Sequence, residues 1–243
     1  MEKEKNLHEG HRNRLKNRFL ENGLDKFEPH NILELLLFYS IPRKDTNDIA
    51  HELIKKFGSL SAVFDANFED LIKVNYITEN SATLIKLIPE ISRAYLLDRV
   101  SHEFNVTDLS ATKELLLSLF HGQKNENVYV LFVSNNFNLL GYEKIHEGSV
   151  NSSIIDTRRI IEYAIKYNAS MLIFAHNHPI GSAYPSMDDI ETTGNLISIF
   201  RPFSFPIIEH FVVNEVECYP IIHNTASLKS GNEENKRLFG EIQ

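Results

Sequence analysis

The stretch "FAHNHPIGSAYPSMDDIETT" (174–193) decides how this chain is interpreted. It continues an apolar run, so His176 and His178 come where a buried strand gives way to a loop that contains proline. Alternate residues of a strand share one face, and two imidazoles on one face can bind a divalent ion such as zinc. Asp189, at the start of the next predicted helix, offers a carboxylate as a third ligand. Three protein ligands leave a fourth position for water, which is the catalytic arrangement.

A second interpretation needs no metal. Ser186 and Asp189 fit a capping box, in which Ser186 caps a helix and Asp189 favours its positive end. Asp188 is an alternative to Asp189 as a ligand. The spacing alone therefore leaves two possibilities open, a metal site or a strand end followed by a well-capped helix.

Around this stretch, strands and helices alternate. The predicted strands are "NVYVLFV" (127–133), 138–150, 170–176 and 205–213. The predicted helices are 111–120, 156–168 and one from Ser186 towards Phe200. Alternation of this kind predicts an α/β layer domain, which we place at residues 104–228.

The first hundred residues have the spacing of helices instead. Gly23 and Gly58 follow amphipathic stretches and are expected C-terminal caps. Pro89 is expected to break a helix or to start a new one. We therefore predict a helical domain over residues 1–100 and a loosely held polar tail over residues 229–243.

The composition narrows the class of protein. The chain has 243 residues, of which 42% are hydrophobic and 24% charged, as in ordinary globular proteins. Its single cysteine, Cys218, excludes a disulfide framework and the Cys-x-x-Cys zinc site of nucleobase deaminases. The charged start predicts no signal peptide, and the apolar stretches are shorter than the ~20 residues of a membrane span. We expect a cytoplasmic protein without membrane contact, and the net charge of -8 argues against a surface that binds nucleic acid throughout.

The residues of the opening stretch resemble a known family. His176-Asn-His178, seven residues, Ser186, two residues and Asp189 reproduce the JAMM (MPN) metalloprotease motif without a gap. The chain as a whole resembles the RadC family, whose C-terminal domain is of this type. Further matching positions are Gly181, Pro185, "GSVNSS" (148–153) and Arg158. The resemblance implies a cytidine-deaminase-like layer domain with a mixed sheet and flanking helices, preceded by a small helix-hairpin-helix-like domain.

The resemblance also implies a set of roles. His176, His178 and Asp189 would bind one zinc ion per chain, and Ser186 would help to hold the oxyanion of a tetrahedral intermediate. Glu126 would accept a proton from zinc-bound water and pass it to the leaving amine. The implied activity is cleavage of a peptide or isopeptide bond in a peptide or protein substrate. Glu126 rests on the resemblance, because spacing does not favour it over Glu143 or Glu147.

An alternative function is a non-catalytic DNA- or protein-binding factor linked to DNA repair. Proteins of the family carry two glycines in the hairpin that approaches phosphates, but Tyr76 and Thr78 stand at those positions here. A basic cluster could neutralise phosphates or simply form a solvated helix face. Its members are Arg12, Arg14, Lys16 and Arg18.

One polar pair interrupts the last apolar strand. Glu209-His210 stands where the family usually has Asp-His. His210 would either support the site from its second layer or form a satisfied polar pair with Glu209 on the open face of the strand. We favour the satisfied pair.

Overall fold

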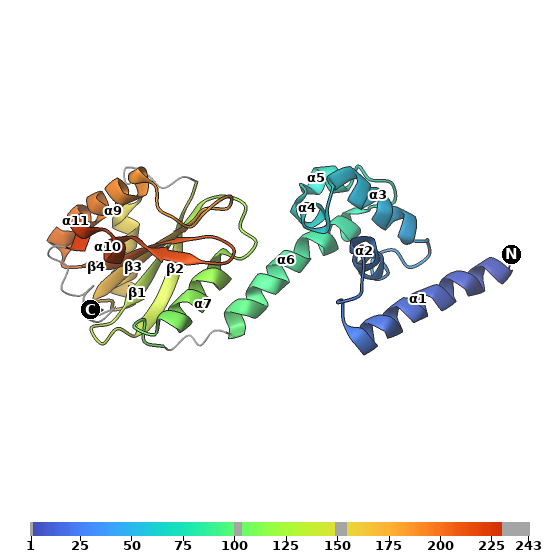
Figure 1. Cartoon of the computed structure of the whole chain (residues 1–243), viewed down its shortest axis with the longest axis horizontal. Helices are drawn as coiled ribbons and strands as arrows, with labels where there is room; N and C mark the ends of the chain where they lie inside the picture. Colours follow the sequence, from blue (N-terminus) through green and yellow to red (C-terminus); the bar gives the residue numbers. More distant parts are fainter. Residues whose placement is uncertain (1, 100–103, 149–154, 230–243) are drawn as a thin grey trace. The chain divides into compact units, whose positions relative to one another are not determined.

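The computed structural model describes residues 2–99, 104–148 and 155–229 (Figure 1). The polar tail from residue 230, the matching positions 149–153 and the interval 100–103 lie outside the described residues. The chain divides into two compact units, Met1–Ser92 and Arg93–Gln243, and this division falls within a helix. In the part of the chain that the structure describes, no helix has both the length and the apolar character of a membrane span.

The first unit is helical. Its elements, in chain order, are α1 (Glu2–Asn22), α2 (Pro29–Leu37), α3 (Asn47–Phe57), α4 (Leu60–Asp65), α5 (Phe68–Leu71) and the start of α6 (Glu79–Arg99). Apolar residues at helical spacing, such as Ile49 and Leu53 of α3, are buried in one shared core. Gly58 ends α3 with a φ of 96°, a conformation that suits glycine. Figure 1 shows α3, α4 and α5 gathered beside the first turns of α6.

Helix α6 runs through Pro89, so the prediction that a helix breaks or starts there is wrong. Proline removes one backbone hydrogen bond and crowds the preceding turn, but it can bend a helix without ending it. Ser81, Ala82 and Ile85 are buried and fix the N-terminal half of α6 in the core of the first unit. The residues after Pro89 then continue the helix to Arg99.

The turn before α6 forms without glycine. Tyr76 adopts a φ of 65°, the left-handed region that glycine enters more easily, at a cost of about 1–2 kcal/mol. Thr78 Oγ1 accepts a hydrogen bond from the N–H of Ser81 at 3.3 Å and so caps the helix start. The Lys44 ammonium lies 3.3 Å from the centroid of the Tyr76 ring. The turn thus forms without the two glycines, and its contact with DNA stays a prediction.

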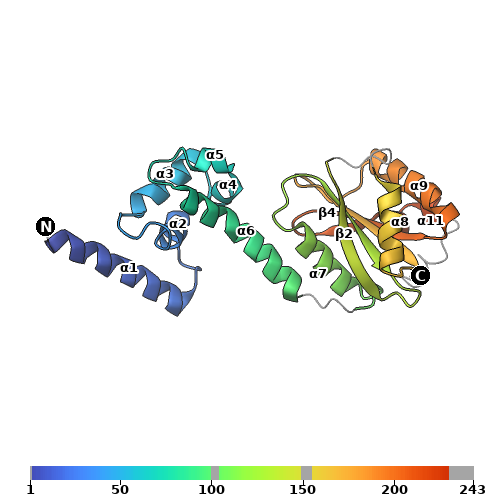
Figure 2. The ribbon, with the colours of Figure 1, turned by 180° about the vertical axis from the view of Figure 1, so that it is seen from behind.

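The second unit is built around a five-stranded mixed sheet (Figure 2). Its strands are β1 (Asn127–Val133), β2 (Leu139–Glu147), β3 (Met171–Asn177), β4 (Ile207–Val213) and β5 (Cys218–Pro220). They lie in the order β2-β1-β3-β4-β5. Strands β3 and β4 are parallel, and the other neighbours are antiparallel. β3, which carries the histidines, is therefore the central strand.

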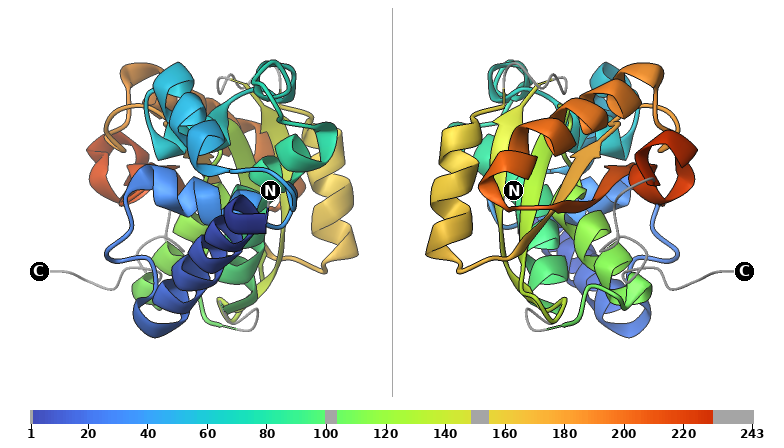
Figure 3. Two further views of the ribbon diagram at one scale, coloured as in Figure 1. Left: turned by 90° about the vertical axis from the view of Figure 1, so that its right-hand side faces the viewer. Right: turned by 90° about the vertical axis from the view of Figure 1, so that its left-hand side faces the viewer.

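Helices cover both faces of this sheet. They are α7 (Leu109–Phe120), α8 (Thr157–Lys166), α9 (Met187–Phe200), the 3-10 turn η1 (Arg201–Phe203), α10 (Ile221–Asn224) and α11 (Ala226–Lys229). α7 packs with one set of strand residues, and α8 and α9 pack with the alternate set. Figure 3 shows α7 and α8 on opposite sides of the sheet. The predicted α/β layer domain with a mixed sheet and a preceding helical region is confirmed.

Candidate metal centre

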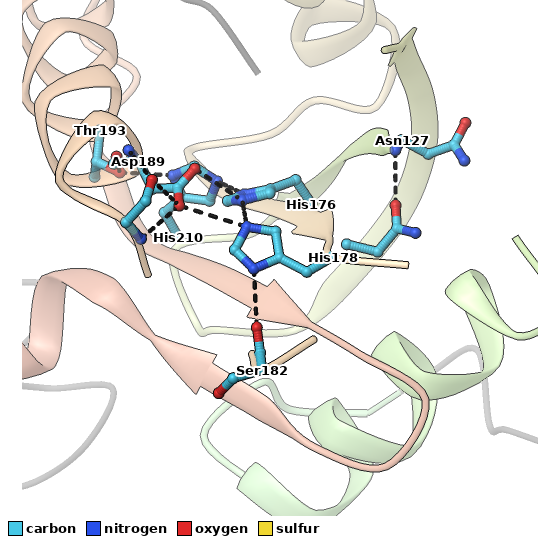
Figure 4. A network of polar contacts seen from close by, with 9 residues as sticks. Asn127, His176, His178, Ser182, Asp189, Thr193 and His210 are labelled. Atoms are coloured by element: carbon cyan, nitrogen blue, oxygen red, sulfur yellow. Dashed lines mark hydrogen bonds and ion pairs between the residues drawn. The ribbon is translucent and has the colours of Figure 1, made fainter. Parts of the chain in front are cut away.

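The end of β3 and the start of α9 bring the predicted ligands together (Figure 4). His176 is the last but one residue of β3, and His178 follows the strand directly. The N–H of His178 donates to the carbonyl oxygen of Val213 at 2.8 Å, which extends the pairing of β3 with β4 beyond the strand end. Asp189 lies in the first turn of α9. Two rigid elements therefore present the three side chains.

The three side chains converge on one point. His176 Nε2 lies 3.1 Å from Asp189 Oδ1, and His178 Nε2 lies 3.5 Å from Asp189 Oδ2. The two Nε2 atoms are 3.3 Å apart. Among the described residues, these three form a group with all ligand atoms within 4.8 Å of one another. Asp188, the alternative ligand, is exposed and lies outside this group.

The chemistry of these atoms fits a cation. His178 Nδ1 lies 2.9 Å from the carbonyl oxygen of Ser182, which can only accept, so Nδ1 carries the hydrogen and Nε2 presents a lone pair. The carboxylate oxygens of Asp189 are also acceptors. One hydrogen on His176 Nε2 cannot serve all these acceptors, whereas a divalent ion can. The predicted His-His-Asp group is therefore suited to hold a metal ion.

Ser186 and Asp189 form the predicted capping box as well. Ser186 Oγ accepts from the N–H of Asp189 at 3.1 Å, and Asp189 Oδ2 accepts from the N–H and the hydroxyl of Ser186 at 2.7 and 2.6 Å. Burial raises the pKa of the Asp189 carboxyl, but His176 and Ser186 outweigh it and hold that pKa well below its usual range. The helix cap and the ligand group coexist, because the cap orients the carboxylate that faces the histidines.

His210 lies behind the site and not on an open face. Its side chain is fully buried, and its Nε2 lies 2.9 Å from His176 Nδ1. Burial lowers the pKa of His210 well below its ordinary value, and the neighbouring His176 lowers it further. Glu209 is also buried, and its carboxylate accepts from the N–H groups of Ile222 and His223. The predicted open-face pair is wrong, because helices cover both faces of β4.

Glu126 lines the same pocket as the ligand group. It is half-buried, directly precedes β1, and shares the pocket with His178, Ser186 and Asp189. The other two glutamates that the sequence offered accept hydrogen bonds from neighbouring side chains. Glu143 accepts from the Tyr167 hydroxyl at 2.9 Å, and Glu147, on the same pocket, accepts from Lys144 at 2.7 Å.

Asn177, between the two histidines, is a residue that the sequence analysis did not single out. Its Oδ1 accepts from the N–H of Asn127 at 2.7 Å, and its Nδ2 donates to the carbonyl oxygen of Asn125 at 3.1 Å. These bonds hold the backbone on both sides of Glu126. The side chain of Asn177 thereby couples the segment that carries the candidate histidine ligands to the segment that carries Glu126.

The basic cluster of α1 makes contacts within the first unit. Arg12 donates to the carbonyl oxygens of Ile41, Pro42 and Lys44, and Arg18 donates to a carbonyl oxygen beyond the end of α1. The Lys16 ammonium lies over an aromatic ring, and Arg14 is exposed. These contacts give the cluster a role in holding α1, and DNA contact by it stays a prediction.

Comparison with known proteins agrees with the motif and the fold. A family model described as "RadC-like JAB domain" matches residues 106–226, which include the whole sheet and all three ligand candidates. The UPF0758 protein FN0909 of Fusobacterium nucleatum subsp. nucleatum is 35% identical over 214 residues. The alignment covers 85% of this chain and 92% of that relative, so the likeness extends into the helical unit. The chain belongs to the RadC family.

Proposed function

We propose that this protein is a zinc-dependent hydrolase that cleaves a peptide or isopeptide bond. The observation that carries the proposal is the convergence of His176, His178 and Asp189 at the wall of a pocket that Glu126 also lines. A scaffold that only binds a partner has no need for two imidazoles and a carboxylate at one point, with a glutamate on the wall of the same pocket. The capping box explains Ser186 and Asp189 but leaves the two histidines without a purpose.

The ligand set favours zinc among the common divalent ions. Two imidazole nitrogens and one carboxylate oxygen suit zinc, whereas calcium and magnesium prefer sites made only of oxygen atoms. A set of three protein ligands is also the catalytic type, which keeps one position for water. When bound, zinc supplies a Lewis acid and lowers the pKa of a coordinated water to about 7.

Three residues in and beside the pocket have further roles in the proposed reaction. Glu126 accepts a proton from the attacking water and returns it to the leaving nitrogen, as a general base and then a general acid. Asn177 holds the backbone of Asn125 and Asn127, so the backbone that carries Glu126 is held against the end of β3. Ser186 is the candidate donor to the oxyanion, for which its hydroxyl turns away from Asp189 Oδ2.

The surroundings of the pocket suit a peptide segment. Ile180, which lines the pocket beside His178, is 95% exposed, and Met187 at the start of α9 is 78% exposed. These two exposed apolar side chains are available to contact an extended substrate chain. Such a rim supports a polymeric substrate over a small polar molecule.

Elemental analysis and a peptidase screen test the proposal together. We expect about one zinc per chain in chelator-stripped and reloaded wild-type protein, and loss of that zinc in the His178→Ala variant. Glu126→Gln should keep the zinc and lose turnover of peptide and isopeptide libraries followed by mass spectrometry. Glu191→Gln, which changes another carboxylate of the same pocket, is the matched control and should retain turnover.

Two results would count against the hydrolase. If neither the wild-type protein nor His178→Ala binds zinc after reloading, the metal site is wrong. If Glu126→Gln and Glu191→Gln cleave equally well, the proton acceptor has been misassigned. In the first case, binding of DNA and protein partners by the helical unit becomes the function to examine.

A further inference from the structure

We propose that His210 and Thr193 form a positioning relay that fixes the hydrogen of His176 on Nδ1 and ties this ligand to the backbone of Asp189. The relay leaves the Nε2 lone pair of His176 facing the metal centre. Neither His210 nor Thr193 is one of the three candidate metal ligands, so both act through the ligand residues that they contact. The inference rests on the proposed metal site and names two residues that serve it.

The contacts of the relay form one unbroken chain (Figure 4). His176 Nδ1 lies 2.9 Å from His210 Nε2, and His210 Nδ1 lies 2.7 Å from Thr193 Oγ1. The Thr193 hydroxyl lies 2.6 Å from the carbonyl oxygen of Asp189. His210 and Thr193 are fully buried, and His176 is 1% exposed. These hydrogen-bonded contacts thus link β3, β4 and α9 out of contact with solvent.

The direction of each hydrogen bond follows from the last acceptor of the relay, the carbonyl oxygen of Asp189. The Asp189 carbonyl oxygen can only accept, so the Thr193 hydroxyl donates to it. The same Oγ1 then accepts from His210 Nδ1–H. A neutral histidine carries one hydrogen, so His210 Nε2 is an acceptor and receives the Nδ1–H of His176. His176 Nε2 is left without a hydrogen, which is the form that binds a metal ion.

The opposite order of hydrogens is disfavoured by the same contacts. If His210 carried its hydrogen on Nε2, His176 would place its own on Nε2, towards His178 and Asp189. His210 Nδ1 and the Asp189 carbonyl oxygen would then compete for the single Thr193 hydroxyl hydrogen. Oγ1 would then face one of these two acceptors, at 2.7 or 2.6 Å, with no hydrogen between the two atoms, which is unfavourable in a water-excluded site. The ring of His210 also packs edge-on against Phe174, with centroids 6.0 Å apart, so the ring is held in place.

The relay predicts a measurable hydrogen position. In protein labelled with ¹⁵N-histidine, long-range nitrogen–proton correlation spectra at one neutral pH should place the His210 hydrogen on Nδ1, both with and without zinc. With zinc bound, His176 should keep its hydrogen on Nδ1. A His210 hydrogen on Nε2 in the metal-free protein would overturn the relay, and this readout needs neither activity nor bound metal.

A matched pair of variants tests the effect on the metal. Thr193→Val keeps the branched shape and removes the hydroxyl, whereas Thr193→Ser keeps the hydroxyl and removes the methyl group. We expect Thr193→Val to weaken zinc binding by about 10–100-fold, as loss of a partner behind a ligand does, and Thr193→Ser to stay within a few-fold of wild type. Affinity is measured by competition with a chromophoric chelator, and thermal unfolding without zinc checks that both variants fold.

The outcomes separate the relay from the proposed function. Equal weakening in both variants would show that Thr193 acts by packing, and unchanged affinity in Thr193→Val would show that the hydroxyl is dispensable; either result overturns the relay. Failure of the wild-type protein to bind zinc would refute the proposed function, while the His210 hydrogen position in the metal-free protein would still decide the relay. A folded Thr193→Val protein with weakened zinc binding and a displaced His210 hydrogen supports it.

Discussion

Replacing Asp189 by asparagine probes the ligand group with little change of shape. Asparagine keeps one side-chain oxygen that can accept from Ser186, so the start of α9 can stay capped. It removes the negative charge and one of the two oxygens that face His176 and His178. Asp188→Asn is the matched control, since Asp188 lies one residue away in the same turn, is exposed and is outside the ligand group.

The expected shift of the Tm follows from linkage between zinc binding and folding. At a free zinc concentration of 100 times Kd, binding stabilises the native state by about 2.7 kcal/mol. For a unit the size of Arg93–Gln243, each kcal/mol shifts the Tm by about 2–4 °C, so zinc should raise the Tm by about 5–11 °C. Loss of a direct ligand should weaken binding by at least about 100-fold, since loss of a partner behind a ligand already costs 10–100-fold. At the same zinc concentration Asp189→Asn then gains about 0.4 kcal/mol, a shift of about 1–2 °C.

Scanning calorimetry of chelator-stripped protein, with and without zinc, measures these shifts. Asp188→Asn should show the full wild-type shift and Asp189→Asn almost none. A wild-type shift in Asp189→Asn would refute the ligand assignment. Loss of the shift in Asp188→Asn alone would identify the neighbouring carboxylate as the ligand.

Two further predictions concern the start of α9 and Tyr167 at the end of α8. Ser186→Ala should destabilise the protein by about 1 kcal/mol in urea unfolding through loss of the cap, and should also weaken zinc binding, whereas Ser186→Thr should restore most of both; an Ala variant equal to wild type in both would contradict the capping role. Burial and the hydrogen bond to Glu143 raise the pKa of Tyr167 to about 12. The folded state thus holds the Tyr167 proton more tightly than the unfolded state, so this contribution to the free energy of unfolding is complete below about pH 10 and is lost as the pH rises towards 12. Urea unfolding at a series of alkaline pH values should show this loss in wild type and not in Tyr167→Phe, and equal losses in both would contradict it.

The main strands of the sheet could be predicted from local sequence. The predicted strand 127–133 coincides with β1, and 170–176 differs from β3 by one residue at each end, because long runs of apolar and β-branched residues between polar ones identify buried strands. β5 and α10, of three and four residues, are too short to show a period, so they were not predicted. The prediction at Pro89 was wrong because the continuation of a helix depends on how the flanking turns pack, which local sequence does not show.

The residues of the site also differ in how well the sequence predicts them, because some lie close together in the sequence and others are brought in by strand pairing. His176, His178 and Asp189 lie within one short stretch, where strand alternation and a helix start already suggest proximity. Glu126 reaches the site because β1 pairs with β3 with Val128 opposite His176, a register that no local pattern specifies. His210 depends on the parallel pairing of β3 with β4, which places it beside Phe174. Its burial was mispredicted because an apolar strand interrupted by a polar pair looks the same whether one face or both are covered.

The order His-Asn-His has a structural reason that the ligand roles alone do not provide. Along the end of β3, His176 and His178 turn their Nε2 atoms to the ligand group, while Asn177 between them turns its amide towards β1. That amide takes up one donor and one acceptor on either side of Glu126, in place of the regular ladder. A shift of β3 against β1 would therefore disturb the two candidate histidine ligands and the glutamate together. His176, Asn177 and His178 thus supply two of the three candidate metal ligands together with the bonds that place them relative to Glu126, the proposed proton acceptor, although β1 and β3 are far apart in the sequence.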